Sequence, residues 1–344
     1  MTDRRGVGVI GLGMASLPHG KSLAALADRI EVRGVFSPSA ERRQAFAKRF
    51  DMPAVERVED ILDDPGIDAV ILLTPPNARV ELVEALAARK KHILLEKPVE
   101  RTTAAAAAVV QRCEQAGVKL GMVFQHRFRD ASLALRKKLA AGDLGTIEAV
   151  QLAVPWWRPQ SYYDEPGRGS YVRDGGGVLI SQAIHSMDLM LSLTGPVKEV
   201  AAIAGTTGLH RMESEDFVGA GLRFENGALG SLTATTACYP GRPESITITG
   251  TKGTATLAGG ELAIDFVDGS RQSVGENTGS GGGADPMDFP HDWHQRLIAS
   301  FLDALDQDLE PSPNGREALQ VHRLIDALQL SARERRHVRL DEFL

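Results

Sequence analysis

The sequence predicts an α/β fold: a Rossmann-type doubly wound parallel sheet, followed by an α+β domain with a large, mostly antiparallel sheet. Up to about residue 122, short apolar runs alternate with segments whose apolar residues recur every three or four positions, the pattern of parallel strands with crossover helices. After about residue 125, short strands separated by turn residues dominate. Because 344 residues exceed the roughly 250–300 at which one core stops growing, we expect two domains, residues 1–124 and 125–344.

The first domain is predicted to hold five buried strands with helices between them. The strands are expected at Val7–Ile10, Val32–Phe36, Ala69–Leu73, His92–Leu95 and Val118–Val123. Ser39 can cap the helix after the second strand. Gly117 can end the alanine-rich helix that begins near Thr102, because glycine adopts positive φ without strain.

The second domain is predicted to carry a long β-rich stretch flanked by helices. Strands are expected at Val197–Ala204, Val218–Phe224, Ala228–Thr235, Ser245–Thr249 and Thr254–Leu257. Helices are expected near Leu133–Ala140, Val178–Leu191, Trp293–Leu305 and Glu317–Ala332. The glycine-rich stretch from Gly275 to Pro286 is predicted to be a flexible loop, for which disorder is favoured over a substrate lid.

The composition is that of an ordinary globular protein and argues against several classes. Hydrophobic residues make up 43% and charged residues 24% of the chain, and the formal net charge is −6, which favours neither nucleic acid nor a membrane as partner. Cys113 and Cys238 form no CxxC pair or disulfide framework, so a cytoplasmic location is expected. The nine histidines show no metal-ligand spacing, and no metal site is expected.

The first strand ends in a glycine-rich turn typical of dinucleotide-binding sites. Gly11 permits a tight turn, Gly13 lets the backbone approach a pyrophosphate, and the helix that follows directs its N-terminal amides at the phosphates. Met14 and Ala15 complete the predicted cofactor turn. Ser16 replaces the usual third glycine or alanine, so the motif alone also fits a glycine turn in another doubly wound fold.

The end of the second strand bears on which nicotinamide cofactor would bind. An acidic residue usually accepts the ribose hydroxyls of NAD there, but this strand runs into Ser37. A missing carboxylate removes the repulsion against a 2′-phosphate, which Ser37 with Arg42 or Arg43 can bind. We expect NAD(P), with a slight preference for NADP, although the two arginines equally suit a solvated helix face.

Lys97 and His185 are the candidate catalytic residues. Oxidation of a secondary alcohol needs a base for the hydroxyl proton and a positive group beside the developing alkoxide. Lys97 follows the fourth strand, at the edge where parallel sheets bind ligands. His185 lies on a predicted helix, where Asp188 or Ser181 can fix its tautomer, and Asp188 is the third candidate catalytic residue. A solvated lysine and a buried structural histidine are the alternatives.

Aromatic and polar residues of the second domain predict a polyhydroxylated substrate. Aromatic faces with hydrogen-bonding tips suit a sugar or polyol ring. Trp156 and Trp157 suit such a substrate site and equally suit a structural role in the core or a subunit contact. His210, Glu213 and Asp216 suit either the site or a polar strand edge. The predicted substrate-binding residues are Gln125, Arg127, Trp157, Tyr163, Arg168, Ser181 and Gln182.

Several motifs in the same order make the chain resemble the Gfo/Idh/MocA oxidoreductases, the family of glucose–fructose oxidoreductase and inositol dehydrogenase. The motifs are Gly11-Leu12-Gly13, Thr74-Pro75-Pro76-Asn77, Glu96-Lys97-Pro98, Gly175-Gly176-Gly177 with Gln182-Ala183-Ile184-His185, Glu213-Ser214-Glu215-Asp216 and Tyr239-Pro240-Gly241. They cover nearly the whole chain, and the part from Ser161 to His185 looks closest to sugar and cyclitol dehydrogenases, such as those that oxidise L-glucose or scyllo-inositol.

The resemblance implies an NAD(P)-dependent enzyme that oxidises a ring hydroxyl of a sugar, sugar acid or cyclitol. It implies cofactor contacts by Thr74, Pro75, Pro76, Asn77, Glu96 and Lys97. It also implies that Lys97 polarises the substrate and that His185 acts as acid or base. It also implies a homodimer or homotetramer. The family's inositol dehydrogenases have an aspartate four residues before the histidine, where this chain has Ser181. The alternatives are a glycoside hydrolase that retains its cofactor and a non-catalytic cofactor-binding regulator.

Overall fold

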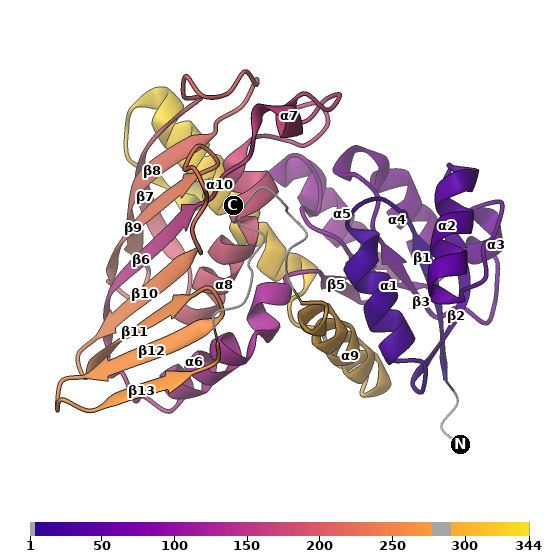
Figure 1. Cartoon of the computed structure of the whole chain (residues 1–344), viewed down its shortest axis with the longest axis horizontal. Coiled ribbons are helices and arrows are strands. Elements are labelled where there is room, and N and C mark those ends of the chain that lie inside the picture. Colours follow the sequence, from indigo (N-terminus) through magenta and orange to yellow (C-terminus); the bar gives the residue numbers. More distant parts are fainter. Residues whose placement is uncertain (1–3, 277–289, 344) are drawn as a thin grey trace. The chain divides into compact units, whose positions relative to one another are not determined.

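The computed structural model describes residues 4–276 and 290–343 (Figure 1). Most of the stretch predicted as a glycine-rich loop therefore lies outside the described residues. The chain forms two compact units. The first unit comprises residues 1–124 and 291–319, and the second comprises 125–290 and 320–344. The boundary after residue 124 coincides with the predicted one, whereas residues 291–319, predicted in the second domain, pack with the first unit.

The first unit is built on a parallel sheet of five strands in the order β2-β1-β3-β4-β5. Its strands are β1 (Arg5–Ile10), β2 (Ile30–Phe36), β3 (Ala69–Leu72), β4 (His92–Leu95) and β5 (Leu120–Met122). Its helices are α1 (Ser16–Ala25), α2 (Ala40–Phe50), α3 (Glu59–Leu62), η1 (Pro76–Ala78), α4 (Val80–Ala88), α5 (Thr103–Ala116) and α9 (Asp292–Asp306). The strand order reverses direction between β1 and β3, and ligands of doubly wound sheets bind at the carboxyl ends of such strands.

Local sequence signals explain these elements. Ser39 caps α2 by accepting a hydrogen bond from the backbone N of Arg42, and Gly117 ends α5 with φ of +65°. All four residues of β3 are buried, as expected for a strand covered on both faces. The predicted parallel sheet is confirmed.

Helix α9 belongs to the first unit because its apolar side faces that core. Trp293, Leu297 and Phe301 recur at helical spacing and are buried. A Cβ on Gly121 of β5 would lie 2.6 Å from a ring carbon of Phe301, so this glycine allows close packing of helix and strand.

The second unit is built on a sheet of nine strands in the order β13-β12-β11-β10-β6-β9-β8-β7-β14. Neighbouring strands are antiparallel except β6 and β9, which confirms the predicted mostly antiparallel sheet. The strands are β6 (Ile147–Pro155), β7 (Val197–Gly205), β8 (Phe217–Phe224), β9 (Leu229–Thr235), β10 (Ser245–Gly250), β11 (Gly253–Ala258), β12 (Glu261–Phe266), β13 (Arg271–Val274) and β14 (Val338–Arg339).

Helices cover one face of this sheet. Buried and half-buried residues alternate along β10 and β11, so each strand gives one face to the core. Helix α8 packs on β6, and α6 packs on β12. The remaining elements are η2 (Gln125–Phe128), α6 (Asp130–Ala140), α7 (Gln160–Tyr163), the π-helical turn η3 (Leu179–Ala183), α8 (Ile184–Thr194), α10 (Gly315–Glu334) and η4 (Leu340–Phe343).

Candidate active site

The glycine turn after β1 has the geometry of a phosphate cradle. Gly11 has φ of +100°, and a Cβ there would lie 2.7 Å from the carbonyl carbon of Leu73, so the turn is held tightly against the end of β3. A Cβ on Gly13 would have no atom within 4 Å, so the backbone faces open space. The Ser16 hydroxyl donates to the Gly13 carbonyl at 2.7 Å and closes the turn that starts α1. The serine is thus compatible with the predicted turn.

Buried polar atoms without a hydrogen-bond partner occur at the same edge of the first unit. They are both ring nitrogens of His19, Thr74 Oγ1, Arg79 Nη1 and Glu96 Oε2. The four residues come from α1 and from the segments that follow β3 and β4. Since buried polar groups in proteins are almost always satisfied, these atoms fit an edge that binds a polar cofactor. His19 Nε2 lies 3.7 Å from Glu96 Oε2.

The segments after β3 and β4 carry the other predicted cofactor residues. Thr74 is half-buried, Pro75 and Asn77 are exposed, and Pro76 is buried at the start of η1. Lys97 is half-buried and stands two residues beyond the end of β4. The structure therefore places both loops at the carboxyl edge of neighbouring parallel strands, where the sequence predicts them.

The turn after β2 contains no carboxylate, and the two arginines Arg42 and Arg43 of the following helix differ in their contacts with it. Ser37 is buried, and its carbonyl accepts a hydrogen bond of 2.6 Å from Arg43 Nη1. Arg42 is exposed on α2. Arg43 thus holds the turn, and Arg42 is the more exposed of the two arginines.

In the second unit, His185 is the second residue of α8, immediately after the π-helical turn η3. Single π-turns of this kind often occur at functional sites. His185 is buried, and its ring stacks on the ring of His126 with centroids 5.0 Å apart and an interplanar angle of 29°. His126 Nε2 lies 2.7 Å from Arg129 Nη2, so the histidine accepts a hydrogen bond from a cation.

Asp188 and Arg127 form a buried bidentate ion pair. Arg127 Nε donates to Asp188 Oδ2 at 2.7 Å, and Nη2 donates to Oδ1 at 2.5 Å. The pair joins η2 to α8 one turn beyond His185. Asp188 is therefore engaged by an arginine, and its predicted role in orienting His185 stays a prediction, as does substrate binding by Arg127. Gln125, at the start of η2, is buried, and its Oε1 has no hydrogen-bond partner.

A second buried arginine, Arg129 at the start of α6, connects the histidine pair to the residue that precedes β10. Arg129 Nη1 donates to Glu244 Oε1 at 2.5 Å. Trp156 Nε1 donates to the other oxygen of Glu244 at 3.3 Å. Trp156 is buried and therefore belongs to the core, one of the two interpretations left open by the sequence.

Four of the predicted substrate-binding residues belong to one aromatic cluster. The Arg168 guanidinium lies 4.6 Å from the centre of the Tyr162 ring, and Gln182 Nε2 donates to the Tyr162 hydroxyl at 3.3 Å. The rings of Tyr162 and Tyr163 meet edge to face at 5.0 Å. Trp157 enters the same cluster through His210, whose ring centroid lies 5.8 Å away.

His210 is the centre of this aromatic cluster. Its Nδ1 lies 2.7 Å from Asp216 Oδ2, and its Nε2 lies 2.8 Å from the carbonyl oxygen of Arg158. Its ring lies 4.9 Å from that of Tyr163, whose pKa is raised by burial. Tyr239 contacts Trp157 edge to face and is 75% exposed. Ser181 is half-buried on η3, and substrate binding by its side chain stays a prediction.

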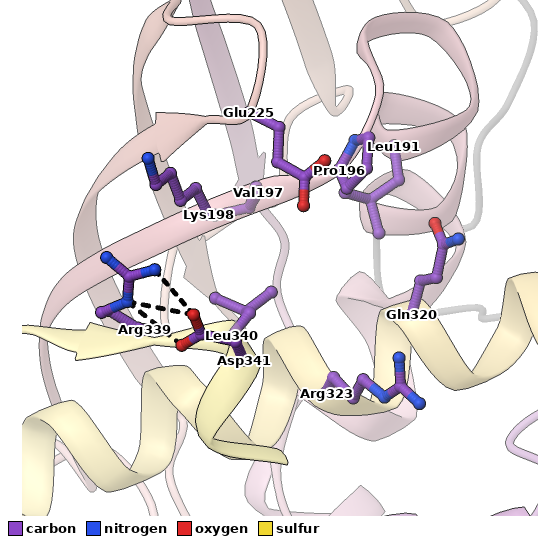
Figure 2. A pocket seen from close by; sticks show the side chains of 10 residues that line it. All are labelled: Leu191, Pro196, Val197, Lys198, Glu225, Gln320, Arg323, Arg339, Leu340 and Asp341. Atoms are coloured by element: carbon purple, nitrogen blue, oxygen red, sulfur yellow. Dashed lines mark hydrogen bonds and ion pairs between the residues drawn. The ribbon is translucent and has the colours of Figure 1, made fainter. Parts of the chain in front are cut away.

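A separate cavity in the second unit has none of the predicted site residues in its lining (Figure 2). It measures about 430 Å³ and lies among the end of α8, the start of β7, α10 and η4. Arg339 at its rim is bound to Asp341 by hydrogen bonds of 2.6 to 3.2 Å.

In the described parts of the chain, no group of His, Cys, Asp and Glu side chains could hold a metal ion. No helix there is long and apolar enough to cross a membrane.

Sequence reasoning did not single out three residues that the structure places at these sites. His19, Arg79 and Glu244 are all buried polar side chains. For His19 the available signal was its position eight residues after Gly11 on the apolar side of the first helix. Arg79 and Glu244 carry no pattern, because the partners of Arg79 are backbone carbonyls and those of Glu244 are 115 and 88 positions away.

Comparisons with known proteins agree with this geometry. Residues 5–124 match an oxidoreductase family with an NAD-binding Rossmann fold, and residues 132–256 match the GFO/IDH/MocA C-terminal domain. A myo-inositol 2-dehydrogenase of Thermotoga maritima is 24% identical over 356 residues, covering 98% of this chain and 99% of that protein. The WlbA dehydrogenase of Bordetella pertussis, in complex with NADH and UDP-GlcNAcA, is 30% identical over 98% of both chains, with a TM-score of 0.82.

A levoglucosan dehydrogenase in complex with NADH shares the fold, with a TM-score of 0.87 at 23% identity over 98% of this chain and 99% of that one. Fold and site together define an NAD(P)-binding oxidoreductase. The chain belongs to the GFO/IDH/MocA family. This confirms the resemblance found in the sequence.

Proposed function

We propose that the protein is an NAD(P)-dependent dehydrogenase that reversibly oxidises a ring hydroxyl of a sugar, sugar acid or cyclitol. The observation that carries the proposal is the set of buried unpartnered atoms of His19, Thr74, Arg79 and Glu96, next to Lys97 and the open backbone of Gly13. A purely structural strand edge would satisfy these atoms within the protein. A polar cofactor at this edge gives them partners.

The residues at the edge suit the parts of a nicotinamide dinucleotide. Gly11, Gly13 and the start of α1 suit the pyrophosphate, and Thr74 with Glu96 suits the nicotinamide half. When bound, the cofactor supplies the acceptor or donor of hydride. Ser37 and the exposed Arg42 favour a 2′-phosphate, and we propose NADP as the preferred form.

Lys97 and His185 are proposed to handle the proton and charge of the substrate hydroxyl. The Lys97 ammonium stabilises the alkoxide that develops as hydride leaves. His185 removes the hydroxyl proton during oxidation and returns it during reduction. Its stacking on His126 limits rotation of the ring and keeps one edge in a constant direction. Asp188 is proposed to support His185 by holding α8 to η2.

The aromatic cluster supports a polyol substrate. Trp157 and Tyr239 provide apolar faces, and Arg168, Gln182 and Tyr162 provide hydrogen-bonding groups beside them. Sugar rings have both apolar faces and dense hydroxyls, and such mixed surfaces recognise them. Relatives named for inositol and levoglucosan dehydrogenation support the same class.

A screen of sugars, sugar acids and inositols with both NAD and NADP tests the function. Formation of reduced cofactor, followed at about 340 nm, is the expected result. Lys97→Met and His185→Ala are expected to lower turnover at least about a hundredfold while NADH binding survives. Glycosidic cleavage without net cofactor reduction would instead establish the redox hydrolase, and cofactor binding without turnover of any polyol would establish the regulator.

The proposal includes a homo-oligomer. Ile203, Leu229, Val267 and Val274 are exposed apolar residues on strands of the large sheet or the adjacent turn. An interface between subunits would cover such exposed apolar side chains. Light scattering of the purified protein is expected to give the mass of a dimer or tetramer, and a mass near 37.0 kDa would contradict the proposal.

A further inference from the structure

The buried side chain of Arg79 has contacts that connect two cofactor loops of the first unit. Arg79 is 1% exposed and stands at the start of α4. Its Nε and Nη2 donate to the carbonyl oxygen of Thr74 at 2.9 and 2.7 Å. Nη2 also donates to the carbonyl oxygen of Lys97 at 3.4 Å. One guanidinium thus binds the backbone of the loops that follow β3 and β4.

The charge of Arg79 is retained in a costly environment. Burial lowers the pKa of the guanidinium to about 10, and the nearby negative charges of Glu96 and Glu100 partly offset this effect by raising the pKa. The guanidinium is still charged at neutral pH, because that value lies well above 7. Its Nη1 has no hydrogen-bond partner. A buried cation with an unsatisfied donor is unfavourable for stability alone, so a role in function is the better explanation.

We propose that Arg79 is a positioning residue that sets the distance between the cofactor loop at Thr74 and the lysine at position 97. The planar guanidinium donates in two fixed directions and therefore fixes one carbonyl relative to the other. The inference rests on the proposed function, because it takes Lys97 as the group that faces the substrate. Its effect on the Thr74 loop also predicts a change in cofactor affinity, which can be measured without substrate.

The same sheet contains a matched control at its opposite edge. Lys91 is 5% exposed and precedes β4, and its Nζ donates to the carbonyl oxygens of Asp64 and Ile67 at 2.8 Å each. Burial lowers its pKa as well. Lys91 is thus another buried cation that ties two segments through backbone carbonyls, but it lies at the amino ends of the strands, away from the cofactor loops.

The experiment compares Arg79→Met, Arg79→Lys and Lys91→Met with the wild type. Cofactor affinity is measured by fluorescence titration with NADH and NADPH, the thermal midpoint by circular dichroism, and kcat and KM with a polyol that the wild type oxidises. Arg79→Met and Lys91→Met are both expected to lower the thermal midpoint. Only Arg79→Met is expected to weaken binding of the reduced cofactor about tenfold and to lower kcat about ten- to a hundredfold, the range for a displacement near 1 Å.

Arg79→Lys keeps the charge without the planar fork, and it is expected to give intermediate losses. If Arg79→Met fails to fold, Arg79→Lys and Arg79→Gln carry the comparison. Arg79 variants that lower the thermal midpoint as Lys91→Met does, but keep cofactor affinity and kcat within twofold of wild type, would overturn the proposal. If the proposed function itself is wrong, the wild-type protein will oxidise no polyol. The cofactor titrations would still test the role of Arg79 in that case.

Discussion

The buried ion pair between Arg127 and Asp188 leads to a prediction about stability and catalysis. Asp188 is fully buried, and Arg127 is 4% exposed. Asp188→Asn keeps the size of the side chain but removes the charge that balances the guanidinium. Removing one partner of a buried pair leaves an uncompensated charge, which costs about 3–5 kcal/mol. We expect the free energy of unfolding of the second unit to fall by this amount.

Urea unfolding followed by circular dichroism measures the loss. The control is Asp63→Asn, which breaks the pair between Arg89 Nε and Asp63 Oδ1 at 2.6 Å, where the Asp63 side chain is 60% exposed. Exposed pairs contribute little, so this change is expected to cost less than about 1 kcal/mol. A loss below about 1 kcal/mol for Asp188→Asn would refute the argument, because the pair would then contribute no more than a surface pair.

The double variant Arg127→Met, Asp188→Leu separates stability from catalysis. Replacing both charges by apolar side chains removes the uncompensated cation, so stability is expected to return to within about 1 kcal/mol of wild type. If the pair is needed to hold His185 on α8, turnover stays low although the protein is stable. Normal turnover of the stable double variant would remove Asp188 from the catalytic residues.

Further predictions concern the first unit. Burial lowers the pKa of His294 in the folded state, so below about pH 6.5 the unfolded chain protonates this residue while the folded chain keeps it neutral. The unfolded state then binds more protons, and the free energy of unfolding falls by about 1.4 kcal/mol per pH unit as the pH decreases. His294→Gln is expected to reduce this slope in urea titrations at pH 7 and pH 5, and an unchanged slope would show that another group causes the pH dependence. Gly11→Ala is expected to cost about 1–3 kcal/mol, since its positive φ and the nearby Leu73 carbonyl oppose a Cβ. Gly13→Ala is expected to leave stability unchanged but to weaken NADH binding about tenfold; equal affinity would place the pyrophosphate elsewhere. Ser37→Asp is expected to shift the ratio of kcat/KM from NADP towards NAD at least about tenfold, and an unchanged ratio would show that this turn does not select the cofactor.

Much of the fold could be predicted from local signals. Strands β1, β3, β4 and β5 are almost entirely buried and appear as short apolar runs, and the caps at Ser39 and Gly117 match their predicted helix ends. In the second unit the alternation along β10 agrees with the strand predicted there. Strands β6, β12, β13 and β14 were not predicted. The four residues of β13 are exposed and β14 has two residues, so these two strands give little periodic signal, whereas the buried Leu262 and Ile264 of β12 do alternate with less buried residues.

The assignment of α9 shows where local signals end. Its amphipathic pattern predicts a helix, but the pattern cannot identify the surface that its apolar side covers. That surface includes α1 and Gly121 of β5, which leaves room for Phe301. The side chain and the glycine are 180 positions apart, so their fit exists only in the folded unit.

Local sequence patterns were sufficient to predict the α/β class, the glycine turn, Lys97 after the fourth strand, His185 on a helix, and the family. These depend on short motifs in which the spacing of a few residues dictates the backbone. The contact of Asp188 with Arg127, the stacking of His126 on His185 and the connection of two loops by Arg79 could be seen only in the folded chain. A buried charge must be paired with a nearby opposite charge or with hydrogen-bonding groups. Folding, and not spacing along the chain, brings such groups together from distant segments.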